Sequence, residues 1–83
     1  MSQLEKRLQK FYRVPVPNDI TFDDVLAIAT HYGCVVKPGG KHLKISYPAF
    51  GAAVPIPRHG NLVQESYIIQ LKKLFYRIEE EKS

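Results

Sequence analysis

Hydrophobic residues near the start of the chain recur at three- and four-residue spacings, the period of an amphipathic helix. The first run predicts a short helix over residues 3–12, with Leu4, Leu8 and Phe11 on one face. The prolines of segment 14–17 end this helix, because proline cannot continue a helix interior. The helix either packs on the rest of the domain or extends a contact with a partner.

A second helix is predicted over residues 22–32, and both of its ends are marked in the sequence. Thr21 is a suitable N-cap, and Asp23 and Asp24 lie in the first turn, where carboxylates complement the helix dipole. Gly33 suits the position after the last turn, since glycine readily adopts the left-handed conformation found there.

Residues 65–80 predict a third helix, with hydrophobic residues again at helical spacing. Its apolar face would be formed by Ile68, Leu71, Leu74, Phe75 and Ile78. Three glutamates at 79–81 oppose the dipole at the C-terminal end, so the helix is expected to fray there. Lys72, Lys73 and Arg77 on its outer side either extend a phosphate-binding track or form the ordinary solvated face of the helix.

Between the second and third helices the pattern changes to the two-residue alternation of β-strands. Residues 34–37, 42–47 and 52–57 form three β-prone runs, separated by turn residues at 38–40 and 48–51. Strands joined in this way form an antiparallel sheet with one apolar and one polar face.

The middle strand and the third strand show how this sheet is oriented. The middle strand places Leu43, Ile45 and Tyr47 on its apolar face and His42, Lys44 and Ser46 on its polar face. Pro55 and Pro57 restrict the third strand to an edge of the sheet or to pairing through one side, because proline has no N–H to donate.

The predicted order, α-α-β-β-β-α, indicates a small α+β fold: a three-stranded antiparallel sheet with helices on one face. The 83 residues fit a single domain over 1–83, with a core at about 21–78 and an extra helix at about 3–12. Cys34 is the sole cysteine, so no internal disulfide is expected. No apolar run is long enough to span a membrane, and no signal peptide is visible, so a cytoplasmic protein is expected.

The net charge of +4 is unevenly distributed along the chain. Residues 37–77 carry seven basic residues and one acidic residue, whereas residues 1–36 are balanced. A basic half beside a neutral half fits a polyanion such as RNA or DNA, although a charged, soluble surface explains it equally well. The sequence has no P-loop, dinucleotide fingerprint, serine-protease-like triad or zinc-spaced cysteine cluster, so no metal or cofactor is expected.

His42 is the first candidate for chemistry, because it opens the polar face of the middle strand directly after a Gly-Gly-Lys turn. An exposed histidine can act as a general acid or base near neutral pH. RNA cleavage without a metal needs a base for the 2′-OH, an acid for the leaving 5′ oxygen and cations for the phosphorane. Lys37, Lys41 and Lys44 could supply those cations. The plain alternative is an ordinary surface histidine.

Two further candidates follow the third strand. Arg58 can form a forked contact with a phosphate, and His59 can supply a second ring or a further phosphate contact. The Pro-Arg-His-Gly segment also fits an ordinary strand exit. His31 has no assigned role. Tyr47 belongs to the core, and Tyr12, Tyr67 and Tyr76 either stack on bases or have no part in binding.

The order of motifs in the central section resembles that of the HicA toxins of HicA–HicB toxin–antitoxin systems. Gly40-Lys41-His42 opens a strand, and Val54 to Gly60 leads into the last helix, so that the resemblance covers about residues 21–78. It implies a fold like that of a double-stranded-RNA-binding domain. It also implies a metal-independent endoribonuclease that cleaves mRNA, an mRNA interferase.

The same resemblance implies roles for particular residues and partners. His42 occupies the position of the catalytic histidine in a Gly-Ser-His motif, and Lys41 stands where the family usually has serine. The implied partner is a HicB-like antitoxin that covers the His42 face and itself provides DNA binding, so that any contact of this chain with DNA is indirect. Two alternatives stay open: a non-catalytic RNA-binding module of the same fold, and a protein-interaction domain whose basic face meets an acidic partner.

Overall fold

The elements of the structure follow the predicted order along the chain. A computed structural model describes residues 2–58 and 60–82, apart from the side chain of Pro38. Its elements are α1 (Gln3–Phe11), α2 (Phe22–His31), β1 (Val35–Gly39), β2 (His42–Tyr47), the 3-10 helix η1 (Pro48–Phe50), β3 (Ala52–Pro57) and α3 (Glu65–Lys82). The α+β class with three strands and three α-helices is therefore confirmed. No described helix is long and apolar enough to cross a membrane.

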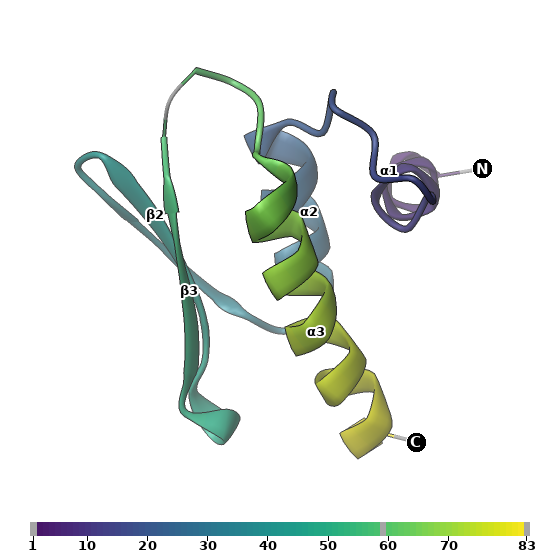
Figure 1. Cartoon of the computed structure of the whole chain (residues 1–83). Helices are drawn as coiled ribbons and strands as arrows, with labels where there is room; N and C mark the ends of the chain where they lie inside the picture. The colour runs from purple at the N-terminus through teal and green to yellow at the C-terminus, as the bar shows by residue number, and fades with distance from the viewer. Residues whose placement is uncertain (1, 59, 83) are drawn as a thin grey trace.

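The three strands form one antiparallel sheet in the order β1-β2-β3. The helices lie on one side of this sheet, and its other side is open (Figure 1). β3 pairs only with β2, as Pro55 and Pro57 led us to expect.

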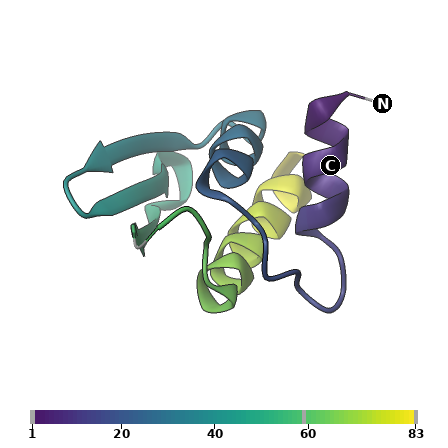
Figure 2. The same ribbon diagram turned by 90° about the horizontal axis from the view of Figure 1, so that it is seen from above.

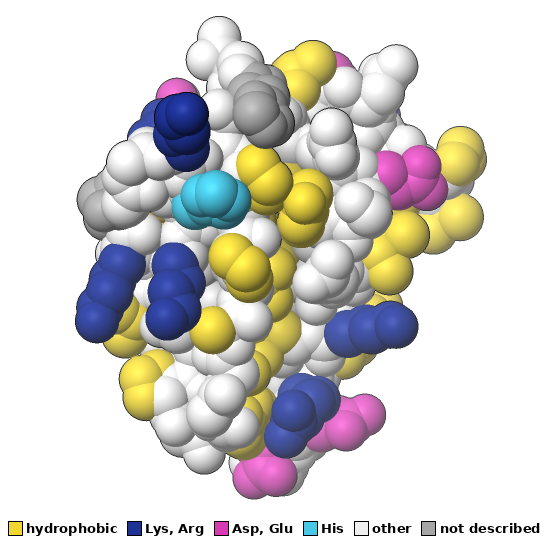
Figure 3. All heavy atoms as spheres, turned by 60° about the vertical axis from the view of Figure 1, so that its left-hand side comes forward, with side chains coloured by type: hydrophobic (Ala, Val, Ile, Leu, Met, Phe, Trp, Pro, Cys, Tyr) yellow, Lys and Arg dark blue, Asp and Glu magenta, His cyan; other side chains and the backbone are white. Residues whose placement is uncertain are grey.

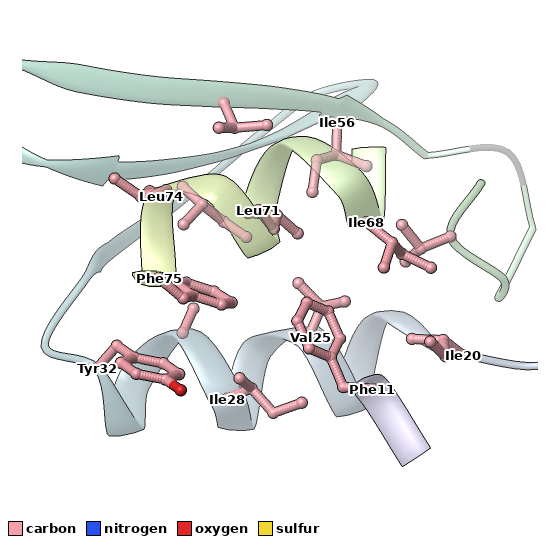
Figure 4. Close-up of a cluster of buried hydrophobic side chains, with 14 of the residues drawn as sticks. Phe11, Ile20, Val25, Ile28, Tyr32, Ile56, Ile68, Leu71, Leu74 and Phe75 are labelled. Carbon is pink, nitrogen blue, oxygen red and sulfur yellow. The ribbon is translucent and has the colours of Figure 1, made fainter. Parts of the chain in front are cut away.

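The core fills the space between the sheet and the two helices α2 and α3 (Figure 4). From the sheet it takes Leu43, Ile45, Val54 and Ile56, and from α3 it takes Ile68, Leu71, Leu74, Phe75 and Ile78. These positions alternate in the strands and recur at helical spacing in α3, as the sequence predicts. The hydrophobic effect of burying them is the main force that holds the layers together.

Helix α1 packs on the domain, on the far side of α2 and α3 from the sheet (Figure 2). The ring of Phe11 has no exposed surface and lies 5.7 Å from the ring of Phe75, centroid to centroid. Of the two roles considered for this helix, the structure shows the packing one, and Phe11 is a full member of the core.

The first hairpin differs from the prediction of a strand at 34–37 and a turn at 38–40. β1 continues to Gly39, because Pro38 pairs with Leu43 and Gly39 pairs with His42. The connection is therefore only Gly40 and Lys41. Gly40 has a φ of +50°, which glycine adopts without the strain of a side chain, and such a residue suits the first central position of a tight hairpin.

The C-terminal end of α3 lies two residues beyond the predicted one, because the helix continues through Lys82. Burial and a hydrogen bond contribute to holding this end. Ile78 is fully buried, and the hydroxyl of Tyr32 donates a hydrogen bond of 2.7 Å to the carboxylate of Glu79. Burial and this hydrogen bond raise the pKa of Tyr32, which keeps the hydroxyl neutral and able to donate.

The hydroxyl of Tyr32 also lies 2.7 Å from that of Tyr12, which follows α1. One hydrogen-bonded chain, Tyr12–Tyr32–Glu79, thus connects the ends of α1, α2 and α3. These tyrosines have a structural role on the side of the molecule away from the open face of the sheet.

Asp24 holds the start of α2 and ties α1 to it. Its carboxylate accepts a hydrogen bond from the backbone N–H of Thr21, and the Thr21 hydroxyl accepts one from the N–H of Asp24, both at 3.1 Å. The same carboxylate lies 3.4 Å from Lys10 Nζ and 3.6 Å from Arg7 Nε. Burial raises the pKa of Asp24, but the hydrogen bonds with Thr21 and the charge of Lys10 outweigh burial and lower it.

The lowered pKa predicts how the stability contributed by Asp24 depends on pH. The contribution is fully present above the unfolded-state pKa of about 3.9 and disappears as the pH falls through the lower pKa of the folded state. Asp24→Asn is expected to lower the free energy of unfolding by about 1–2 kcal/mol at pH 7. Urea unfolding at pH 7 and at pH 3 tests this: the difference between wild type and variant should shrink at pH 3, and an unchanged difference would contradict it.

Candidate nucleic-acid interface

The open face of the sheet is built from three rows of side chains. Residues paired across antiparallel strands project from the same face, so the register fixes the rows. They are Gly39–His42–Pro57, Lys37–Lys44–Pro55 and Val35–Ser46–Ala53. Leu43 and Ile45, which alternate with these β2 residues, are buried against the helices, so the rows face away from the helices.

His42 lies at one end of this face, as predicted, in the first position of β2. Its register partners are Gly39 on β1 and Pro57 on β3, neither of which has a long side chain that could cover it, and the His42 side chain is exposed. In the described part of the chain no hydrogen bond or ion pair engages its imidazole ring. The ring is therefore free to contact a ligand.

Lys37 and Lys44 lie directly opposite each other in the next row. Like charges at such positions repel each other and destabilise the sheet slightly. Among the described residues, no carboxylate forms an ion pair with Lys37 or Lys44, whereas the cations of α1 pair with Asp19 and Asp24. A bound anion, such as a phosphate, would relieve the repulsion.

Lys41 lies next to His42 in the hairpin turn, and the end of β3 holds it there. The backbone N–H of Arg58 donates a hydrogen bond of 2.8 Å to the carbonyl oxygen of Lys41. The structure therefore places Lys37 and Lys44 on the open face one row from His42, and Lys41 in the hairpin turn that adjoins His42.

The side chain of Arg58 takes another direction. Its Cζ lies 5.5 Å from the centroid of the Phe22 ring, at the start of α2. There it lines a small polar hollow together with Thr21, Asp23 and Asn61. Only the backbone of Arg58 supports the site, because the alternation that turns Pro57 to the open face turns the next side chain toward the helices. His59, the other candidate in this segment, lies outside the described residues.

Two predicted cations of α3, Lys72 and Arg77, lie away from the open face of the sheet. Lys72 Nζ lies 5.9 Å from the centroid of Phe11, on the α1 side of the helix. Arg77 Cζ lies 4.6 Å from the centroid of Phe50, where it holds η1 against α3. Tyr47 is half-buried against Phe50, which agrees with its assignment to the core.

The contribution of β3 side chains to the open face was not predicted from the sequence. The prolines at 55 and 57 mark an edge strand, but they also project from the open face beside Lys44 and His42. Counting the two-residue alternation back from Ile56 and Val54 would have placed them there.

Within residues 2–58 and 60–82, no three histidine, cysteine, aspartate or glutamate side chains gather as a metal-binding group. Comparisons of the chain with protein-family models, with curated proteins and with solved structures find no match. The chemistry of the open face is therefore the basis on which a function can be assigned.

Proposed function

We propose that this protein is a metal-independent endoribonuclease with His42 as its general acid and base, and that it is the toxin of a toxin–antitoxin pair of the HicA–HicB type. The observation that carries the proposal is the exposed ring of His42, which has no described partner and lies on the open face one row from the facing Lys37 and Lys44. Lys41 adjoins His42 in the hairpin turn. A base among uncompensated cations is what phosphodiester cleavage without a metal requires.

The arrangement of α2, the three strands and α3 supports this proposal. A helix, an antiparallel three-stranded meander and a second helix, with both helices on one face, is the arrangement we infer to be like a double-stranded-RNA-binding domain. Helix α1 would be an addition to that arrangement, on the side away from the open face.

The proposed reaction uses the 2′-OH of the RNA as the nucleophile. The His42 ring accepts the 2′-OH proton while the 2′ oxygen bonds to phosphorus and the bond from phosphorus to the 5′ oxygen breaks. The imidazolium then returns the proton to the leaving 5′ oxygen, so the products are a 2′,3′-cyclic phosphate and a 5′-hydroxyl. Lys41, with Lys44 and Lys37, would stabilise the negative charge that the phosphorane develops.

The same face would be the target of the antitoxin. A protein that presents carboxylates to Lys37 and Lys44 would gain favourable charge contacts and would cover His42 at the same time. We propose that a HicB-like antitoxin does this and that it contributes the DNA-binding part of the complex.

Incubation of the purified, antitoxin-free protein with RNA in EDTA tests the proposal. Cleavage is expected, with cyclic-phosphate ends, and an RNA with a single 2′-deoxy nucleotide should resist cleavage at that linkage because it lacks the nucleophile. Cleavage that EDTA abolishes would refute the metal-independent mechanism. RNA binding without cleavage would instead identify a non-catalytic RNA-binding module, and neither binding nor cleavage would favour a protein-interaction domain.

A further inference from the structure

The open face of the sheet is divided lengthwise by charge. Its β1 and β2 side carries His42, Lys37 and Lys44, and its β3 side carries Ala53, Pro55 and Pro57. Figure 3 shows this division, with Lys and Arg side chains on the left of a histidine and hydrophobic side chains on its right. The side chains of the β3 side have neither charge nor a hydrogen-bonding atom.

The backbone at the free edge of β3 is also poor in hydrogen-bond donors. The N–H of Arg58 points to β2, where it meets the carbonyl of Lys41, and the direction of the N–H groups alternates along an antiparallel strand. The N positions of residues 53, 55 and 57 therefore face the free edge. Two of these residues are prolines, which have no N–H, so only Ala53 offers a donor.

On the basis of the proposed ribonuclease function, we infer that an unpaired RNA strand lies along β2 with its phosphates over β1 and β2 and its bases over β3. Phosphates are drawn to Lys37 and Lys44, whereas the flat faces of the bases can lie on the rings of Pro55 and Pro57. The opposite orientation would place phosphates over an uncharged strand and would leave the two facing lysines without a counter-charge.

This orientation determines the substrate class. Bases are distinguished by hydrogen bonds to their edges. The side chains on the β3 side have no hydrogen-bonding atom, and the free edge of β3 offers one N–H donor beside carbonyl acceptors that lie in the plane of the sheet, below a base resting on the prolines. Cleavage should therefore be nearly indifferent to base identity. Bases can reach the proline surface only when they are not paired and stacked in a duplex, so the substrate should be single-stranded RNA.

Photocrosslinking tests the orientation independently of cleavage. The His42→Ala variant would be irradiated with a single-stranded RNA that carries 4-thiouridine, and the modified peptides identified by mass spectrometry. Trypsin separates the two sides of the face: β1 falls in fragment 14–41, because the Lys37–Pro38 bond resists cleavage, and β3 falls in fragment 45–58. Crosslinks from the bases are expected in residues 52–57, and crosslinks mainly in residues 35–39 would overturn the inference.

Sequencing of the products from a random-sequence RNA tests the substrate class with the wild-type protein. A specific base contact discriminates by at least about fivefold, so cleavage rates at the different dinucleotide steps should differ by less than that. The same sequence closed into a hairpin stem should be cleaved at least about tenfold more slowly than as a single strand, because paired and stacked bases cannot contact the prolines of β3.

The outcomes separate this inference from the function on which it rests. Cleavage with a strong base preference, or equal cleavage of stem and single strand, would overturn the inference and leave the ribonuclease intact. If the wild-type protein does not cleave RNA but the His42→Ala variant crosslinks through β3, the orientation is supported and the catalytic function is refuted. Absence of both RNA binding and cleavage would overturn both.

Discussion

RNA cleavage by the His42→Ala variant is expected to fall at least about hundredfold, because positioned general acid–base catalysis contributes on that order or more. The imidazole is the one described side chain of the open face that can both accept and donate a proton near neutral pH. The variant should keep its fold, since the His42 side chain is exposed and has no partner among the described residues. Single-turnover cleavage with saturating protein measures the loss, and circular dichroism and the melting temperature verify the fold.

His31→Ala is the matched control for this experiment. His31 is also an exposed histidine at the boundary of an element, but it ends α2 and contacts the ring of Tyr32 at 5.2 Å. Its removal should leave the cleavage rate within about twofold of wild type, since it lies outside the open face. A well-folded His42→Ala variant that cleaves at the wild-type rate would remove His42 from the mechanism.

Lys41 adds a second comparison. The proposed HicA-type function predicts a serine at this position, before the catalytic histidine. The structure places Lys41 in the hairpin turn against the end of β3. If the wild-type protein binds RNA without cleaving it, Lys41→Ser separates two causes. Cleavage gained by this variant would show that the site is intact and that the lysine blocks it, whereas continued inactivity would favour the non-catalytic module.

Most of the fold could be predicted because its elements carry local signals. The two-residue alternation of β2 fixes which side chains face the core, and the Thr21 cap fixes the start of α2. The errors arise where tertiary contacts override such signals. The sequence places the end of the third helix at residue 80, but α3 extends to Lys82, with the buried Ile78 and the hydrogen bond from Tyr32 to Glu79 near its end.

For the candidate site, the sequence predicts only which residues of β2 share a face. The alternation within β2 places His42 and Lys44 on one face, but it does not show that Lys37 lies directly opposite Lys44, because the register depends on the length of the hairpin turn. The alternation in β3 gives the direction of the Arg58 side chain, but its contact with Phe22 could not be predicted, because the two residues are distant in the sequence.

The Phe11→Ala variant is expected to lose about 3–5 kcal/mol of unfolding free energy, the usual result of truncating a fully buried phenylalanine. Phe11 has no exposed surface, and its ring contacts those of Tyr12 and Phe75. A chain of 83 residues has a total stability of about 4–12 kcal/mol, so this loss would be a large part of the whole. Urea unfolding monitored by circular dichroism measures it.

Leu4→Ala is the matched control, because Leu4 belongs to the same helix but is not part of the core. It should cost less than about 1 kcal/mol, as is usual for positions that are not fully buried. Equal and small effects of the two substitutions would contradict the docking of α1. Because α1 lies beyond α2 and α3 from the sheet, Phe11→Ala should leave RNA cleavage unchanged wherever the variant is still folded (Figure 1). A loss of cleavage in the folded variant would instead show that the helical layer controls the geometry around His42.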